Sequence, residues 1–165
     1  MYLIDANVLI RAHGDFYPID RVPQFWAWLV EQGQQDNVKI PPEIYDEITV
    51  GDDALANWAK EADVKAALLL DETPDPALVQ QVLVEGYEGD DPEFTDVDVQ
   101  KIGRDAFIVA YALAQAGRVV VTKEVSASSK RRGNRKMPDA CNDCGVDWTN
   151  DFEMYRLLNF NLSGR

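Results

Sequence analysis

The 165-residue chain has one histidine, His13, and two cysteines, Cys141 and Cys144. A Ser-His-Asp or Cys-His catalytic site would therefore have to be built on His13, which follows an apolar run and is expected at the surface or at a helix end. The cysteines form a single Cys-x-x-Cys, and zinc would need two further ligands, of which His13 could supply one. We expect reduced structural cysteines in a short helix, 138–145, that a glycine ends.

The chain also lacks long apolar segments. No run of about 18 apolar residues occurs, which predicts no membrane span. No basic segment followed by an apolar stretch opens the sequence, which predicts no signal peptide and hence a cytoplasmic location. The length indicates a single domain, 1–165, and the hydrophobic content of 46% is ordinary for a folded protein.

Positive charge is scarce, with 16 Lys and Arg against 29 Asp and Glu, for a net charge of −13. This balance opposes nucleic-acid binding, which depends on phosphate contacts with Lys and Arg. The charges are segregated, however. An acidic segment (residues 85–98) is expected at the surface, and its first part, 85–92, is expected to be a loop. A basic loop (residues 125–136) contains five positive residues: Lys130, Arg131, Arg132, Arg135 and Lys136.

The first ten residues are the most informative part of the chain. The apolar run Tyr2–Ile4 ends at Asp5, and a second apolar run, Val8–Ile10, follows after three residues. The pattern predicts a buried strand that turns into a helix, and in open parallel sheets chemistry collects at the carboxyl ends of strands. A carboxylate there needs compensation for its lost hydration, for which a metal ion is one candidate. The alternative is that Asp5 or Asn7 simply caps the helix.

Three more acids follow at predicted strand–helix junctions. A second strand, 38–42, leads into a helix, 43–48, that carries Glu47. Oxygen ligands of this kind are the ones that Mg²⁺ and Mn²⁺ prefer.

The third and fourth acids lie in the second half. Asp105 stands near the start of an apolar helix, 104–117, of the kind that is usually buried. The β-branched strand 118–124 then ends in Thr122 and Glu124.

This succession resembles the PIN domain, the fold of the VapC-type ribonuclease toxins. An early strand in that family ends in Asp-x-Asn, as in Asp5-Ala6-Asn7, and a Glu-Ile pair follows in a helix, as in Glu47-Ile48. An Asp opens a long alanine-rich helix, matched by Asp105–Ala110. The next strand ends in Val-Thr-x-Asp, matched by Val121–Glu124 with Glu in place of Asp. The resemblance spans residues 1 to about 160.

The resemblance implies an α/β, PIN-like domain with a central, mostly parallel sheet of about four strands flanked by helices. Its implied metal-binding and catalytic residues are Asp5, Glu47, Asp105 and Glu124. The implied supporting residues are Asn7, Thr122 and Asp139, and either Asp139 or Asp143 could supply the fourth acid in place of Glu124.

The implied activity is hydrolysis of RNA phosphodiesters by an endoribonuclease that uses Mg²⁺ or Mn²⁺. The family further implies the toxin component of a type II toxin–antitoxin pair, with an antitoxin protein and a homodimer as possible partners and no membrane. The basic loop is the candidate RNA-binding element, although a solvated flexible loop remains open. The alternative functions are a DNA-directed or 5′-nuclease-type enzyme and a non-catalytic PIN-like binding module.

Three other segments are expected to be scaffold. The aromatic stretch 22–30 is expected to be an amphipathic helix, and the apolar run 66–70 is of ambiguous type. The segment 148–158 is expected to be a closing helix capped by Thr149 or Asn150.

Overall fold

The computed structural model describes residues 1–162, so the last three residues of the expected domain lie outside the described part. The centre of the fold is a sheet of four strands, all parallel, in the order β2-β1-β3-β4. The strands are β1 (Tyr2–Ile4), β2 (Val38–Lys39), β3 (Val119–Val121) and β4 (Asp147–Thr149). The expected α/β class with a sheet of about four strands is confirmed.

The strand order places a topological switch beside β1. The chain leaves β1 and adds β2 on one side, then returns to add β3 and β4 on the other. In the sheet, Leu3 lies opposite Lys39 of β2 and opposite Val120 of β3. Connections that leave in opposite directions open a crevice at the carboxyl ends of the two strands, where ligands bind in folds of this kind. Asp5 and Thr122 are the first residues after β1 and β3.

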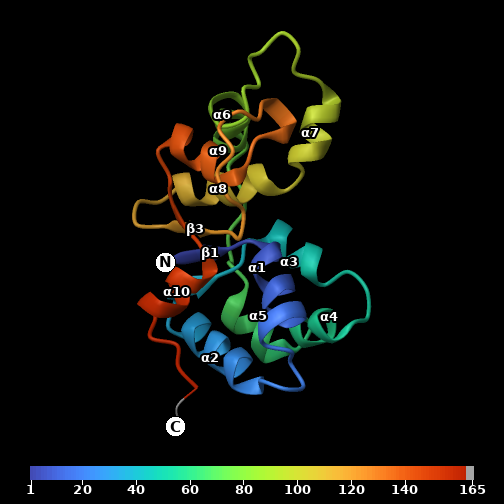
Figure 1. Ribbon diagram of the computed structural model, residues 1–165, viewed down its shortest axis with the longest axis vertical. Helices are drawn as coiled ribbons and strands as arrows, with labels where there is room; N and C mark the ends of the chain where they lie inside the picture. Colours follow the sequence, from blue (N-terminus) through green and yellow to red (C-terminus); the bar gives the residue numbers. More distant parts are fainter. Residues whose placement is uncertain (163–165) are drawn as a thin grey trace.

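Helices cover both faces of the sheet (Figure 1). The first half of the chain forms α1 (Ala6–Arg11), the π-helical turn η1 (Ala12–Phe16), α2 (Pro23–Gln34), α3 (Pro42–Ile48), α4 (Ala54–Ala59) and α5 (Ala62–Leu68). The second half forms α6 (Pro76–Glu85), α7 (Asp96–Ile102), α8 (Asp105–Leu113), the 3₁₀ turn η2 (Arg132–Asn134), α9 (Met137–Cys144) and α10 (Asp151–Leu157).

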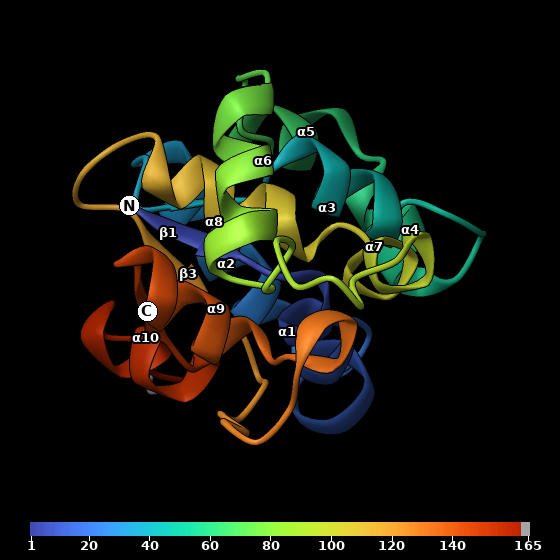
Figure 2. The ribbon, with the colours of Figure 1, turned by 90° about the horizontal axis from the view of Figure 1, so that it is seen from above.

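The sheet separates two helical layers. Helices α6, α8 and α9 lie on one side, and α2, α5 and α10 lie on the other (Figure 1). Seen from above, α6 crosses over α8, which is thereby covered by the sheet on one face and by α6 on the other (Figure 2). This position explains why α8 is apolar on almost all sides: Ile108 and Val109 are fully buried.

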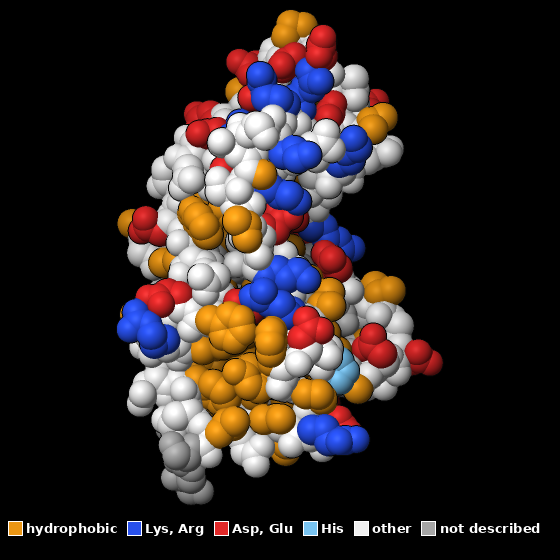
Figure 3. Space-filling model, in the orientation of Figure 1, with side chains coloured by type: hydrophobic (Ala, Val, Ile, Leu, Met, Phe, Trp, Pro, Cys, Tyr) orange, Lys and Arg blue, Asp and Glu red, His pale blue; other side chains and the backbone are white. Residues whose placement is uncertain are grey.

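Apolar and charged side chains gather at different ends of one face (Figure 3). Hydrophobic side chains collect over α2 and α10. Phe152 of α10 and Phe16 of η1, whose rings contact each other, are large apolar residues that stay exposed. At the opposite end, basic and acidic side chains lie intermixed. Within residues 1–162, no helix is both long enough and apolar enough to cross a membrane.

The structure corrects the expected closing helix. Residues 147–149 form strand β4, and α10 begins only at Asp151. Asn150 caps it, as one of the two expected caps, by accepting a hydrogen bond from the Glu153 amide at 2.9 Å. The strand was missed because its three residues gain their hydrogen bonds from β3, a partner that local sequence does not reveal.

Other expected elements have shifted boundaries. The ambiguous run 66–70 completes α5 and then forms a bridge between Ile40 and Leu69. The helix expected over 104–117 ends at Leu113, and Gly117 adopts a φ of 83° in the turn before β3.

The cysteine-containing helix is confirmed as α9. Gly145 ends it in the left-handed conformation, with a φ of 68°. Cys141 and Cys144 are free thiols and both are buried, as expected. Burial raises the pKa of Cys144 to about 11 and that of Cys141 still further, so both thiols are protonated at neutral pH.

Candidate functional site

Asp5 lies where the sequence pattern places it, at the carboxyl end of β1. Its side chain is only 5% exposed, and its carboxylate accepts a hydrogen bond from the Thr122 hydroxyl at 3.1 Å. Asp5 occupies the N-cap position of α1, but its side chain makes no capping hydrogen bond. Asn7 lies inside α1 and also makes no cap there. The capping alternative for this segment is therefore wrong.

Thr122 connects the ends of the two central strands. Its hydroxyl donates to Asp5 and accepts hydrogen bonds from the Asn7 side-chain amide and from the Glu124 backbone amide, each at 3.2 Å. The Asn7 side-chain oxygen in turn accepts from the Lys123 amide at 3.1 Å. The two expected supporting residues therefore fix the position of the Asp5 carboxylate relative to β3.

Asp105, at the start of α8, is the second acid of this site. Burial is the largest cause that raises its pKa to about 8, and the charges of Asp5, Glu124 and Glu47 raise it further. Asp5 behaves in the same way. Burial raises its pKa to about 7 against the lowering effect of the Thr122 hydrogen bond, with smaller contributions from Glu47 and Glu124. The four expected acids thus lie close enough to repel one another electrostatically.

Glu47 and Glu124 differ from this pair in their surroundings. Glu47 is exposed on α3. Glu124 is partly buried, and its carboxylate accepts hydrogen bonds from Lys136 Nζ at 3.1 Å and from the Met137 amide at 2.8 Å. The charge of Glu124 is therefore compensated within the protein, whereas no Lys or Arg among residues 1–162 forms an ion pair with Asp5.

The donor set has the chemistry of a divalent-cation site, but the side chains do not enclose one point. Among residues 1–162, no three Asp, Glu, His or Cys side chains converge in a group that could hold a metal ion. The carboxyl groups of Asp5 and Asp105 nevertheless have raised pKa values, because desolvation and the negative charges of the neighbouring acids both disfavour their ionised forms. A hard divalent cation would supply that compensation and hold both groups ionised. The acids therefore suit a divalent cation by the type of their donor atoms and by their electrostatics.

The other two candidates for the fourth acid have structural partners. Asp139 accepts hydrogen bonds from the Ser126 hydroxyl and from the Ala127 amide, which holds the start of the basic loop against α9. Asp143 forms an ion pair with Arg135. Both residues support the basic loop.

The acidic segment and the basic loop are not independent surface elements. Arg131, Arg132 and Arg135 are paired with carboxylates of the acidic segment. The prediction of a surface loop over residues 85–92 is also wrong at its start, because Glu85 is the last residue of α6 and both Gly86 and Tyr87 are buried.

Tyr87 is the residue of this region that the sequence analysis missed. Its hydroxyl is buried and has no hydrogen-bond partner among the described residues. Burial raises its pKa well above the usual value, and the charges of Asp105 and Glu124 act in the same direction. A buried hydroxyl without a partner is unfavourable, so its position beside the acids calls for a ligand or water. No local signal distinguished this tyrosine from its acidic neighbours.

Another buried carboxylate, Asp151, follows β4 at the same edge of the sheet and is 1% exposed. Arg11 of α1 pairs with both of its carboxylate oxygens, and the guanidinium group also lies over the Phe152 ring. The charge of Asp151 is thus compensated by Arg11 of α1. In this respect Asp151 differs from Asp5.

The comparisons with known proteins give one match. Residues 2–162 match a family described as Domain of unknown function (DUF4411). No curated protein and no solved structure matches the chain. Because the family match covers almost the entire sequence, the chain belongs to the DUF4411 family.

Proposed function

We propose that the protein is a divalent-metal-dependent endoribonuclease that hydrolyses RNA phosphodiesters. The observation that carries the proposal is the pair formed by the buried Asp5 and the half-buried Asp105, whose carboxyl pKa values are raised to about 7 and about 8 at the carboxyl end of a parallel sheet. Perturbed acids at such a switch point are typical of functional sites rather than of structural ion pairs. The ordered resemblance to PIN-domain motifs gives the reaction class.

Each residue of the site would have its own role. Asp5, Asp105 and Glu47 would hold the Mg²⁺ or Mn²⁺ ion, with Glu124 as the fourth acid. When bound, the ion would activate water and stabilise the departing oxygen of the phosphodiester. Thr122 orients the Asp5 carboxylate through its hydrogen bond. Hydrogen bonds from Lys136 and the Met137 amide fix the orientation of the Glu124 carboxylate.

The biological part of the proposal rests on the family resemblance. A protein of this kind would act in the cytoplasm as the toxin of a type II toxin–antitoxin pair, and an antitoxin would block the acidic site. A homodimer is part of the same proposal.

The test is cleavage of a labelled single-stranded RNA in Mn²⁺ and in excess EDTA. We expect cleavage that stops in the chelator, and a rate at least about 10²-fold lower for Asp5→Asn, because metal position controls the reaction. Asp20→Asn is the matched control, since Asp20 is exposed and pairs only with its neighbour Arg21. Undiminished cleavage in EDTA would contradict the proposal.

One observation favours the binding-module alternative. The ion pair between Lys136 and Glu124 leaves fewer acids with an uncompensated charge, and hence fewer that need a metal ion. A non-catalytic module would bind RNA without cleaving it under any metal condition. Preferential cleavage of single-stranded DNA of the same base sequence would instead favour the DNA-directed alternative.

A further inference from the structure

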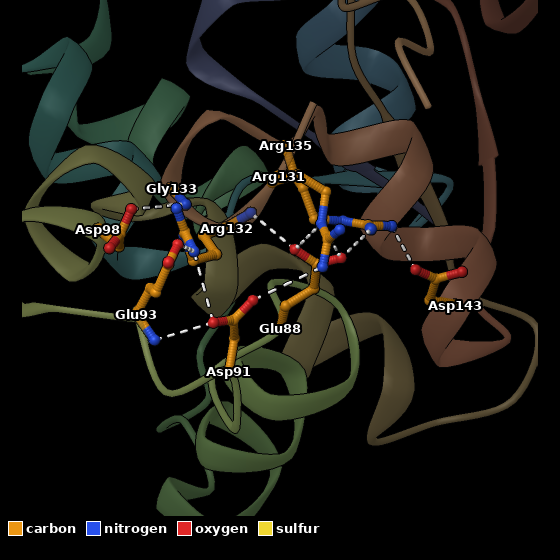
Figure 4. A network of polar contacts seen from close by, with 9 residues as sticks. All are labelled: Glu88, Asp91, Glu93, Asp98, Arg131, Arg132, Gly133, Arg135 and Asp143. Carbon is orange, nitrogen blue, oxygen red and sulfur yellow. Dashed lines mark hydrogen bonds and ion pairs between the residues drawn. The ribbon is translucent and has the colours of Figure 1, made fainter. Parts of the chain in front are cut away.

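The acidic segment and the basic loop meet in a dense set of ion pairs (Figure 4). Glu88 is at its centre. Its carboxylate lies 2.6 Å from Arg131 Nε and 3.3 Å from Arg135 Nη1, and it also accepts a hydrogen bond from the Arg132 amide at 3.0 Å. One carboxylate thus contacts three residues of the basic loop.

Two more acids extend the contact. Glu93 lies 2.6 Å from Arg132 Nη1, and Asp91 lies 3.4 Å from the same nitrogen. Asp91 also lies 3.6 Å from Arg131 Nη2. Each of these two guanidinium groups is therefore shared between carboxylates of the acidic segment.

The backbone of the basic loop also lies directly against the acidic segment. The Gly133 amide donates a hydrogen bond to Asp98 at 3.1 Å, and a Cβ atom at Gly133 would come within 2.7 Å of the Asp98 Cα atom. Only glycine permits this approach. The contact between the two segments therefore involves both backbone and side chains.

The other end of the same loop reaches the candidate active site. Lys136 pairs with Glu124, and Ser126 and Ala127 bind Asp139. The basic loop thus runs from the site acids to the acidic segment, and a polyanion that enters the site meets arginines already paired with carboxylates.

We propose that the acidic segment competes with phosphate for the arginines of the basic loop, so that an RNA strand binds there by displacing Glu88, Asp91 and Glu93. The identity of the polyanion as RNA rests on the proposed function. A guanidinium group binds carboxylate and phosphate through the same planar pair of N–H donors, so the two compete for one surface. Arg131 is 61% exposed where it pairs with Glu88, which is 21% exposed, and Glu93 is 78% exposed where it pairs with Arg132, which is 26% exposed. Each pair therefore has one member open to solvent, and ion pairs that water reaches are weak enough to exchange.

The first test compares two variants of equal net charge. Glu88→Gln removes the central carboxylate charge, and Glu153→Gln removes one that also pairs with an arginine, Arg156, but on α10. The binding of a fluorescently labelled oligo-uridine is measured by anisotropy in EDTA, so that the result does not depend on metal-driven cleavage. We expect binding about threefold to tenfold tighter for Glu88→Gln than for Glu153→Gln, because more of the arginines are free to release counterions from phosphate.

A second variant and a second measurement guard against a folding effect. Glu93→Gln, at the exposed rim of the contact, should tighten binding in the same direction but by less. In the wild type, saturating oligo-uridine should speed hydrogen exchange of the Arg132 amide, which donates to Glu88. This acceleration reports displacement directly.

Equal affinity of Glu88→Gln and Glu153→Gln would overturn the inference, as would unchanged or slower exchange of the Arg132 amide. Absence of RNA binding by Glu88→Gln would also overturn it, because the released arginines would then have no role toward RNA. Failure of the proposed function looks different: no metal-dependent cleavage occurs, while the binding difference and the exchange change can both remain.

Discussion

The Thr122 hydroxyl donates a hydrogen bond of 3.1 Å to the Asp5 carboxylate across the junction between β1 and β3. The two residues are 117 positions apart in the chain, yet each is the first residue after its strand. This contact lowers the pKa of a carboxyl group that burial otherwise raises. It therefore links the architecture of the sheet to the charge state of the candidate site.

Thr122→Val should weaken this site with little change in side-chain shape. The Asp5 carboxylate would lose a buried hydrogen bond, so we expect a loss of about 1–3 kcal/mol of folding free energy and weaker Mn²⁺ binding. Thr122→Ser is the control, because it keeps the hydroxyl. Urea unfolding and calorimetric Mn²⁺ titration measure the two effects. If Val and Ser variants bind Mn²⁺ equally well, the hydroxyl does not position Asp5.

The raised pKa values predict a specific pH dependence of stability without metal. In Asp105 the folded-state pKa of about 8 exceeds the ordinary value of 3.8, so the folded protein binds more protons between these limits. The contribution of Asp105 to stability is then fully present below about pH 4 and is lost as pH rises through the folded-state pKa. Asp5 contributes in the same direction up to about pH 7.

Asp105→Asn should remove part of this loss of stability at rising pH. At pH 8 we expect its Tm to exceed that of the wild type by about 4–8 °C, which corresponds to about 2 kcal/mol. Thermal melts in EDTA at pH 5 and pH 8 measure it, with the exposed Asp20→Asn variant as a control that keeps the wild-type decline. Saturating Mn²⁺ should stabilise the wild type at pH 8 but have little effect on Asp105→Asn. Identical pH profiles for wild type and Asp105→Asn would contradict the assignment of Asp105 to the buried acid pair.

The fourth acid can be identified by comparing isosteric variants. Glu124 acts electrostatically on both Asp5 and Asp105, whereas Asp139 binds the basic loop at Ser126 and Ala127. We therefore expect Glu124→Gln to weaken Mn²⁺ binding and Asp139→Asn to leave it unchanged while loosening the loop. Calorimetry and hydrogen exchange of the Ala127 amide separate the two effects. A greater loss of Mn²⁺ affinity in Asp139→Asn would reverse the assignment.

Tyr87 offers a test of whether its buried hydroxyl serves the acid site. Tyr155 is the matched control, because its hydroxyl is also buried without a described partner, but the carboxylate that acts on it is Asp151. Tyr87→Phe should reduce the increase in Tm that Mn²⁺ produces, since the hydroxyl would no longer bind the hydrated site. Tyr155→Phe should leave that increase unchanged. Equal Mn²⁺ effects in both variants would assign Tyr87 to packing alone.

Local sequence was sufficient for several parts of this protein. The apolar run that ends at Asp5, the β-branched run that ends at Thr122 and the glycine that ends α9 each carry their own structural preference. These features depend on steric preferences of the backbone within a few residues. Thr122 was expected near the site only as a supporting residue implied by the PIN resemblance, and its hydrogen bond to Asp5 was not predicted.

Tertiary structure decided what depends on partners distant in sequence. Strand β4 forms because β3 supplies its hydrogen bonds, although local signals favoured a helix there. Tyr87 is buried in a segment whose composition is that of a loop, and the arginines near it pair with acids more than 30 positions away. Whether a polar group finds a hydrogen-bond partner, and whether a charge is buried, depends on which segments pack together. A single sequence does not show which distant segments will do so. The sequence thus determined the fold class and the candidate acids, whereas only the folded chain determined which charges remain uncompensated.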